Sequence, residues 1–320
     1  IDLLTITPAS ASSKATASQS TRATPLGTVP TGAGHGMNAG MSPSNDQKAP
    51  PDKNRREAKM RKNKSSKSKL PPQNNDKRKK VVIITSRVHP GETPAQYILQ
   101  GIIDLITSDL PEAKLLRDNI VFKVIPMLNP DGVFLGNYRC SYMGYDLNRC
   151  WGDPTDWCHP EIAGAKRLIM SHYYDDSKDN GGVTGGDEDL RSHIEFNGTE
   201  KVDVFLDIHA HSSASNSFMY CNSSSARRDR EFPRLLSERA PDFKFHQTKF
   251  DQDPSKEGTG RRELGAIMPG VRCYTLEVSF FAAVQKSGIP IPYTQHSYME
   301  LGKCVALTFA DLYKLDLSSD

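Results

Sequence analysis

The sequence predicts an α/β protein, a three-layer α/β/α sandwich around a mixed, mostly parallel twisted sheet. Apolar, β-branched runs such as "VVIIT" at 81–85 are typical of strands buried on both faces. Between these runs, apolar residues recur at helical spacing, and strands that alternate with helices indicate helical layers on the faces of a parallel sheet. The length of 320 residues is enough for one substantial core.

The expected elements follow one another from the start of the chain. "IDLLTIT" at 1–7 predicts a short strand, and because no turn or cap precedes it, we expect the chain to begin within a domain. The run at 81–85 predicts a buried strand, 94–108 a helix and 120–128 a second buried strand. Further along, the sequence predicts a helix at about 160–174, a strand at 202–210, a helix around 232–240, a strand at 272–280 and a helix from about 294 to 314.

Two segments interrupt this alternation. Residues 8–80 are rich in Ser, Thr, Gly, Pro, Asn and Lys, which predicts a disordered, basic, low-complexity insertion. Residues 11–80 carry 16 Lys and Arg against four Asp and Glu, whereas the rest of the chain carries 25 against 34. The segment is thus either a solvated linker or a surface for nucleic acid or another acidic polymer. A second, flexible insertion is expected at about 175–200.

The composition also bears on the compartment. The six Cys show no C-x-x-C spacing, which favours reduced thiols over a disulfide framework or a structural zinc site. No run of about 18 or more apolar residues occurs, and the first residues lack the pattern of a secretory signal, so we expect no membrane segment. A cytoplasmic location follows as the expectation.

Candidate metal ligands lie where predicted strands end. His89 and Glu92, in "TSRVHPGETPAQ", follow the first buried strand, and His209 and His211 end the strand "FLDIHAHS". In an open α/β sheet, ligands bind outside the carboxyl ends of the strands. A catalytic zinc commonly takes three protein ligands, such as two His and one Glu. His89 and Glu92 with one of the two later His would supply that set, and Glu277 lies within the apolar run "YTLEVSF".

Four motifs in a fixed order also resemble a known family. They are "HPGE", "NPDGVFLGNYRCSYMGYDLNRCW", "DIHAHS" and "YTLEVSF". The chain resembles the zinc carboxypeptidases, and most closely the cytosolic carboxypeptidases, enzymes that remove glutamates from tubulin and other acidic tails. Within that family it is most similar to the type 6 members. The resemblance covers 81–315 apart from the second insertion, and implies a catalytic domain at 81–316 that includes the strand at 1–7.

The resemblance implies one zinc ion per chain. His89, Glu92 and His209 match the three zinc ligands of the family, which makes His211 a neighbouring residue. Asp146 matches the carboxylate that receives the other ring N–H of the first His ligand. Such a partner holds the tautomer and the orientation of the ring.

Catalytic and substrate-binding roles follow from the same resemblance. Glu277 matches the general base, which takes a proton from water and returns it to the leaving amine. Arg139 matches the arginine that polarises the scissile carbonyl. Asn148 and Arg149 match the pair that binds the terminal carboxylate of the substrate.

A basic residue near "GTGRR" is expected to favour acidic side chains in the specificity pocket. Arg261 is the first candidate for this role and Arg262 the second. Lys256 and Arg272 are expected to assist or simply to be solvated. No tyrosine occupies the place of the mobile phenol of the pancreatic enzymes, so a cap of that kind is not expected.

The sequence therefore predicts a zinc metallocarboxypeptidase that removes C-terminal or side-chain glutamates from acidic protein tails. Tubulin is the leading partner, which would associate the protein with the cytoskeleton. The resemblance also implies that the family's amino-terminal β-sandwich domain is absent from this chain. Two alternatives stay open: a zinc amidohydrolase of the aspartoacylase or succinylglutamate type, and a non-catalytic protein that binds microtubules or nucleic acid through residues 11–80.

Overall fold

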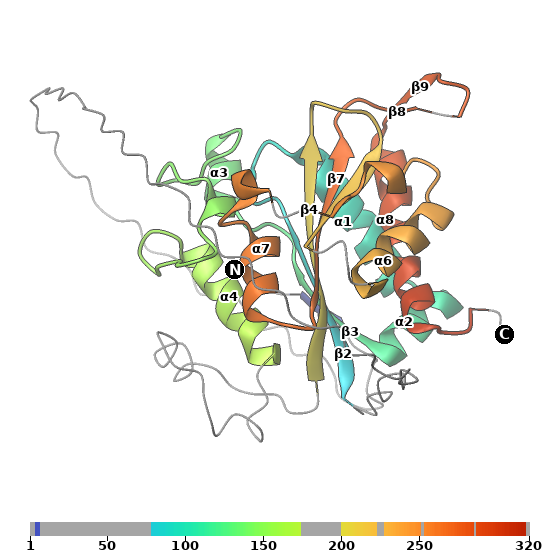
Figure 1. Ribbon diagram of the computed structural model, residues 1–320, viewed down its shortest axis with the longest axis horizontal. Coiled ribbons are helices and arrows are strands. Elements are labelled where there is room, and N and C mark those ends of the chain that lie inside the picture. Colours follow the sequence, from blue (N-terminus) through green and yellow to red (C-terminus); the bar gives the residue numbers. More distant parts are fainter. Residues whose placement is uncertain are drawn as a thin grey trace, which may run out of the picture. The chain divides into compact units, whose positions relative to one another are not determined.

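A seven-stranded sheet in the order β1-β3-β2-β4-β7-β5-β6 organises the fold in the computed structural model (Figure 1). The structure describes residues 4–6, 78–173, 200–222, 227–250, 253–284 and 286–317. The strands of this sheet are β1 (Leu4–Ile6), β2 (Lys79–Ser86), β3 (Ile120–Ile125), β4 (Glu200–His211), β5 (Ser217–Cys221), β6 (Lys249–Phe250) and β7 (Arg272–Ser279). A separate hairpin pairs β8 (Ala282–Val284) with β9 (Pro290–Pro292).

The centre of the sheet is parallel and its margins are mixed. Strand β2 pairs in parallel with both β3 and β4, and β4 pairs in parallel with β7. At the margins β1 runs antiparallel to β3, β5 runs antiparallel to β7, and β6 is parallel to β5. The mixed, mostly parallel sheet that the sequence predicts is confirmed.

Helices cover both faces of the sheet, which makes the three predicted layers (Figure 1). One layer contains α1 (Thr93–Thr107), α2 (Pro111–Asn119), α6 (Arg227–Arg239) and α8 (Gln295–Tyr313). The other contains α4 (Pro160–Tyr173) and α7 (Gly260–Ile267), which pack around the fully buried Trp151. Each face of the central strands is thus buried under apolar side chains, the condition under which a strand is apolar throughout.

Helices α1 and α8 approach each other at two glycines. A Cβ on Gly101 would lie 2.0 Å from the carbonyl oxygen of Met299, and a Cβ on Gly302 would lie 2.0 Å from that of Ile98. The helix backbones are therefore in direct contact, and a larger residue at either glycine would separate them. At its start, α8 has a capping box between Thr294 and Ser297, which satisfies backbone N–H groups of the first turn.

The predicted helices and strands within the described residues are confirmed, with differences at their ends. Strand β3 ends earlier than 128, α6 begins at Arg227, and β4 extends from Glu200 to His211. Strand β2 begins at Lys79, so the last two residues assigned to the basic insertion belong to the sheet instead. Residues 8–77 of that insertion and residues 175–199 lie outside the described residues.

Several short elements were not anticipated. Strand β5, helices α2 and α7, and α3 (Pro130–Leu135) are short, and α2 and α7 carry too few apolar residues for a clear helical pattern. Their formation depends on packing against neighbours rather than on local propensity. Among the described residues, no helix is long and apolar enough to cross a membrane.

Candidate metal centre and active site

The loop after β2 is held in place by the segment that follows β3. Arg87 adopts a left-handed backbone conformation, with φ of 58°, at the start of this loop. The side-chain amide of Asn129, which is fully buried, donates to the carbonyl of Val88 at 3.1 Å and accepts from Gly132 N at the start of α3. Further along the loop, Gly91 N donates to the carbonyl of Tyr138 at 2.8 Å. These bonds set the positions of the residues that follow.

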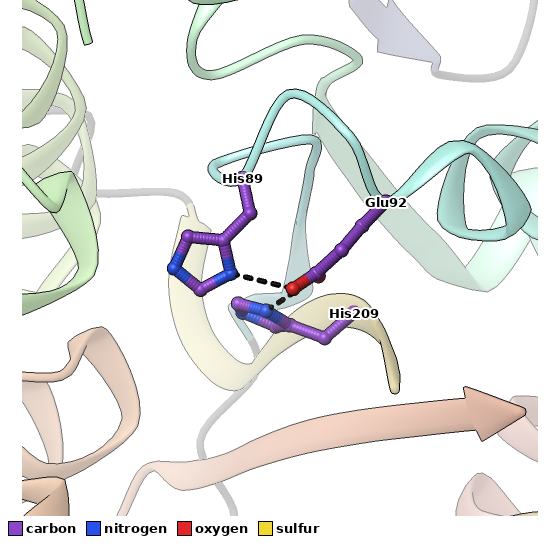
Figure 2. Close-up of side chains that lie close together, drawn as sticks. All are labelled: His89, Glu92 and His209. Carbon is purple, nitrogen blue, oxygen red and sulfur yellow. Dashed lines mark hydrogen bonds and ion pairs between the residues drawn. The ribbon is translucent and has the colours of Figure 1, made fainter. Parts of the chain in front are cut away.

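Three side chains from two strand ends meet in a buried cluster (Figure 2). His89 and Glu92 come from the loop after β2, and His209 comes from the end of β4. The Nδ1 atom of His89 lies 2.7 Å from Oε1 of Glu92, and the Nδ1 atom of His209 lies 3.1 Å from Oε2. One ligand atom from each residue lies within 4.8 Å of the others. Both imidazoles thus direct the same ring nitrogen at one point.

The opposite ring nitrogens are held by carboxylates. The Nε2 atom of His89 lies 3.0 Å from Oδ1 of Asp146, the residue predicted for this contact. The Nε2 atom of His209 lies 2.6 Å from Oδ2 of Asp207, a contact that was not predicted. A carboxylate can only accept, so Asp146 and Asp207 favour a proton on each Nε2. With an ion bound between Glu92 and the two rings, each Nδ1 would supply its lone pair.

The acids and imidazoles of the cluster shift one another's pKa values. Burial alone would raise the pKa of Glu92, but the charges and hydrogen bonds of His209 and His89 outweigh it and hold that pKa below its usual range. Burial alone would lower the pKa of His209, but the carboxylates of Asp207 and Glu92 outweigh it and raise that pKa well above its usual value. The carboxylates of the cluster therefore favour a positive charge in the site, either on His209 or on a bound cation.

The donor set fits a zinc ion. Two imidazole nitrogens and one carboxylate are a set that catalytic zinc uses, with the fourth position left to water or substrate. His89, Glu92 and His209 are all buried, at 4%, 8% and 2% exposure, so a bound ion would be shielded on the protein side. His211 lies at the cavity wall, where its Nδ1 accepts from Ala214 N at 3.3 Å, and it is outside the group that could bind a metal.

Glu277 lies beside the metal cluster because of the sheet register. In the parallel pair of β4 and β7, Glu277 is the direct partner of His209. Both residues line a cavity of about 240 Å³. Burial raises the pKa of Glu277 to about 7, since the opposing effect of His209 is smaller. A carboxyl group with such a pKa can both accept and donate a proton near neutral pH.

The residues predicted to contact the substrate backbone line the same cavity. Arg139 contacts Oδ2 of Asp146 through Nε at 2.9 Å and Nη2 at 2.8 Å, and its side chain is 41% exposed. The guanidinium of Arg149 donates to the carbonyl of Asn148 at 2.9 Å. The side chain of Asn148 is buried, and its Oδ1 accepts from Gly260 N at 3.0 Å. Two of the three residues thus keep exposed donors, while the amide of Asn148 is engaged within the protein.

The four predicted basic residues separate into two groups. Arg261 and Lys256 line the cavity near the Tyr220 ring, with Cζ of Arg261 at 5.8 Å and Nζ of Lys256 at 5.1 Å from the ring centroid. Arg262, the second candidate, donates to the carbonyl of Asp253 and is not among the lining residues. It follows Arg261 on α7, where consecutive residues point in different directions.

Arg272 was expected either to assist at the cavity or to be solvated, and it does neither. Arg272 is the first residue of β7, whereas Glu277 and the cavity lie toward the carboxyl end of that strand. Its guanidinium pairs with Asp203 at 2.5 Å. Of these four basic residues, only Lys256 and Arg261 line the cavity.

Comparisons with known proteins agree with this arrangement. A family model described as zinc carboxypeptidase matches residues 53–267, a range that includes the three residues of the metal cluster. The chain therefore belongs to the zinc carboxypeptidase family, a family of zinc-dependent peptide hydrolases. The match ends before Glu277, so the position of that residue beside the cluster is an observation of the structure alone.

Curated relatives identify the branch of the family that this chain resembles. Cytosolic carboxypeptidase 6 of Mus musculus is 46% identical over 241 residues, which are 73% of this chain and 41% of the relative. The protein of the same name in Homo sapiens is also 46% identical, over 73% of this chain and 44% of its own. That of Caenorhabditis elegans is 39% identical, over 73% and 49%. The predicted resemblance is confirmed, and the chain spans less than half the length of these relatives.

Solved structures share the fold at lower identity. A metallo-carboxypeptidase from Burkholderia cenocepacia is 22% identical and covers 76% of this chain and 59% of its own, with a TM-score of 0.58. A metallo-carboxypeptidase from Pseudomonas aeruginosa is 21% identical over 76% and 59%, with a TM-score of 0.57. These two matches support the α/β/α architecture.

Proposed function

We propose that this chain carries the catalytic site of a zinc metallocarboxypeptidase that removes glutamates from acidic protein tails. One observation carries the proposal: a two-His, one-Glu metal cluster and the half-buried carboxyl group of Glu277 line one cavity together with basic side chains. The basic residues of the cavity wall are Arg139, Arg149, Lys256 and Arg261. The alternative class of small-molecule amidohydrolase gains no comparable support.

In this proposal His89, Glu92 and His209 hold the zinc ion. When bound, zinc supplies a Lewis acid that lowers the pKa of a water molecule toward about 7. Glu277 accepts the proton of the attacking water, and as the peptide C–N bond breaks it donates that proton to the leaving amine. Its raised pKa suits both halves of this transfer.

Arg139 and Arg149 are proposed to bind the reacting part of the substrate. The Arg139 guanidinium, oriented by Asp146, would donate to the carbonyl oxygen as negative charge develops on it. Arg149, with the neighbouring Asn148, would bind the free carboxylate of the terminal residue, for which the planar guanidinium fork is well shaped. Asp146 would have a second role, since it also holds the Nε2 atom of His89.

Arg261 and Lys256 are proposed to select acidic side chains. Arg261 is 2% exposed and its Nη1 donates to the Cys221 carbonyl and to Asn222, so its positive charge is held in place at the cavity wall. Lys256 also lines the cavity and is less buried than Arg261. Two fixed positive charges favour a glutamate side chain over a neutral one.

The nature of the substrate protein is inferred from the relatives. The curated matches are named cytosolic carboxypeptidases, which supports an exopeptidase of the cytoplasm. The resemblance to enzymes that trim glutamates from tubulin supports tubulin as a substrate and the cytoskeleton as its location. The metal cluster contains no part of the basic insertion at 8–80, so zinc binding and catalysis are assigned here to residues outside it.

The proposal is tested with synthetic peptides and mass spectrometry. Zinc-loaded protein is incubated with a peptide that ends in several glutamates, beside the same peptide ending in alanine or lysine. We expect stepwise loss of single glutamates, little cleavage of the other ends, and no cleavage by the Glu277→Gln variant. Folded, zinc-bound protein that trims none of the peptides would contradict the proposal, and release of acetate or succinate from acylated amino acids would point to the amidohydrolase instead.

A further inference from the structure

A buried acid, Asp207, contacts the imidazole of His209 in the metal cluster. It lies on β4 two residues before His209, and alternate residues of a strand point to the same face. Its exposure is 1%, which makes it one of the most buried ionisable residues that the structure describes. An ionised carboxyl group in such a place is costly unless hydrogen bonds and a positive charge compensate it.

Both oxygens of Asp207 are used. Oδ2 lies 2.6 Å from Nε2 of His209, and Oδ1 accepts a hydrogen bond of 2.7 Å from the hydroxyl of Thr85. Thr85, which is fully buried on β2, is the direct partner of Asp207 in the sheet register. The hydroxyl prevents rotation of the carboxylate, and the carboxylate in turn restrains the imidazole ring.

The amide of Asn148 is the other polar group near this nitrogen, and it does not compete. Its Nδ2 atom lies 3.3 Å from Nε2 of His209, but its Oδ1 accepts from Gly260 N, which orients the NH₂ group toward the ring. An NH₂ group is a donor and cannot accept the proton of Nε2. Asp207 is therefore the acceptor for a proton on Nε2, whereas Nδ1 faces Oε2 of Glu92 at 3.1 Å. With an ion bound between Nδ1 and Glu92, only Nε2 would carry a proton.

We propose that Asp207 is a positioning residue for the metal centre: it holds the proton of His209 on Nε2 and thereby directs the Nδ1 lone pair at the zinc ion, with Thr85 as its anchor. The inference rests on the metal site of the proposed function. It differs from the pairing of His89 with Asp146, because Asp146 also contacts Arg139 and its side chain is 21% exposed. The negative charge of Asp207 is shared with a neutral hydroxyl only, so more of it acts on the imidazole.

The test measures zinc affinity by competition with a chelator, separately from peptide cleavage. Removal of a carboxylate behind a His ligand typically weakens metal binding by about 10- to 100-fold, and we expect a loss of this size for Asp207→Ala. The wild-type carboxylate uses one oxygen for His209 and the other for Thr85, and Asp207→Asn retains only one acceptor oxygen. A smaller loss of zinc affinity than in Asp207→Ala is therefore expected. Thr85→Val keeps the contact with His209 and should weaken zinc binding less than about tenfold.

Asp203→Asn is the matched control. Asp203 is a buried acid of the same strand, 8% exposed, but its partners are Arg228, Arg272 and Tyr313, outside the metal cluster. We expect this variant to lose stability and keep its zinc affinity. ¹⁵N NMR of the imidazole provides a second readout: in the zinc-bound wild type Nε2 of His209 is protonated, and in Asp207→Ala that proton exchanges faster.

The outcomes separate this inference from the proposed function. Zinc affinities of folded Asp207→Ala and Asp207→Asn within twofold of the wild type would overturn the role of Asp207 and leave the metal site intact. An equal loss in Asp203→Asn would also overturn it, because the effect would then be general destabilisation. If Asp207→Ala does not fold, Asp207→Asn decides, since it has nearly the same size. Wild-type protein that binds no zinc would overturn the metal site itself.

Discussion

The two ends of strands β4 and β7 carry charged clusters of opposite kinds. At the amino end of β7, Arg272 pairs with Asp203 of β4 at 2.5 Å. Toward the carboxyl ends, His209 of β4 is the register partner of Glu277 of β7. The same two strands, paired in parallel, thus hold both clusters within one sheet.

At the amino ends, the protein supplies its own cations. Asp203 contacts Arg272, Arg228 at 2.6 Å and the Tyr313 hydroxyl at 2.9 Å. At the carboxyl ends the acids are compensated differently. Of Glu92, Asp146, Asp207 and Glu277, only Asp146 has arginine ion pairs among the described residues.

The cluster at the amino ends is therefore suited to stability, and the cluster at the carboxyl ends is suited to function. A cluster whose charges are neutralised by fixed guanidinium groups contributes to holding β4, β7, α6 and α8 together. A cluster in which one carboxylate and two imidazoles bring their ligand atoms together is suited to a cation from solution, at the cost of some stability in its absence. The predictions that follow perturb one end and monitor the other.

The largest expected effect is on catalysis at the carboxyl end. Glu277→Gln removes the proposed proton acceptor, and the rate of peptide cleavage should fall by about 10²- to 10⁴-fold. The free energy of unfolding should not fall, because an acid whose pKa is raised by burial destabilises the folded state at neutral pH. Steady-state kinetics and urea unfolding measure the two quantities. A loss of stability without a loss of rate would show that Glu277, at the carboxyl end, serves stability rather than catalysis.

At the amino end, the expected effect is on stability. Arg272→Met leaves Asp203 partly uncompensated and should lower the free energy of unfolding by about 3 kcal/mol. The value of kcat/KM for the folded protein should stay unchanged. Arg234→Met is the control, since the Arg234–Glu238 pair is exposed and worth less than about 1 kcal/mol. Equal destabilisation by both variants would show that burial of the pair is irrelevant.

The pH dependence of cleavage reports the carboxyl end directly. Because burial raises the pKa of Glu277 to about 7, this group takes up its proton at a higher pH than an ordinary glutamate. A protonated carboxyl cannot act as a base, so kcat/KM should decrease by about tenfold per unit as the pH falls below this pKa. Bound zinc lowers the pKa, so the inflection lies at or below about 7.

Zinc occupancy is measured at each pH as the control, since protonation of the imidazoles also releases the metal. A rate that stays constant to pH 5 at full zinc occupancy would show that the pKa of Glu277 is not raised in the zinc-bound protein.

The smallest expected effect concerns selectivity at the cavity rim. Lys256→Met removes a partly exposed charge, and an interaction of about 1 kcal/mol corresponds to a loss of about fivefold in the preference for glutamate over glutamine ends. Arg262→Met is the matched control, because Arg262 does not line the cavity. Competition between the two peptides measures the preference. An equal loss in both variants would indicate an effect of net charge rather than of position.

Much of the metal centre was predictable from residue types and their spacing. His89 and Glu92 follow a buried apolar run, and His and Glu are residue types that catalytic zinc uses as ligands. Asp207 was missed although a signal was present, since it precedes His209 by two residues and so shares its face of the strand. The choice between Arg261 and Arg262 was not readable, because the helix that orients them, α7, is too short to show a pattern.

The sequence by itself determined the fold class and, through the resemblance of its motifs, the family and the three candidate metal ligands. The fold class follows from apolar periodicity, which is readable within single segments of the chain. The choice of His209 over His211 came from the resemblance. Only the tertiary structure decided that Glu277 lies beside His209, that Arg272 belongs to the opposite end of the sheet, and that Asp207 accepts from Thr85. Each of these contacts joins separate strands, and the register between strands depends on packing of the whole sheet rather than on any one segment.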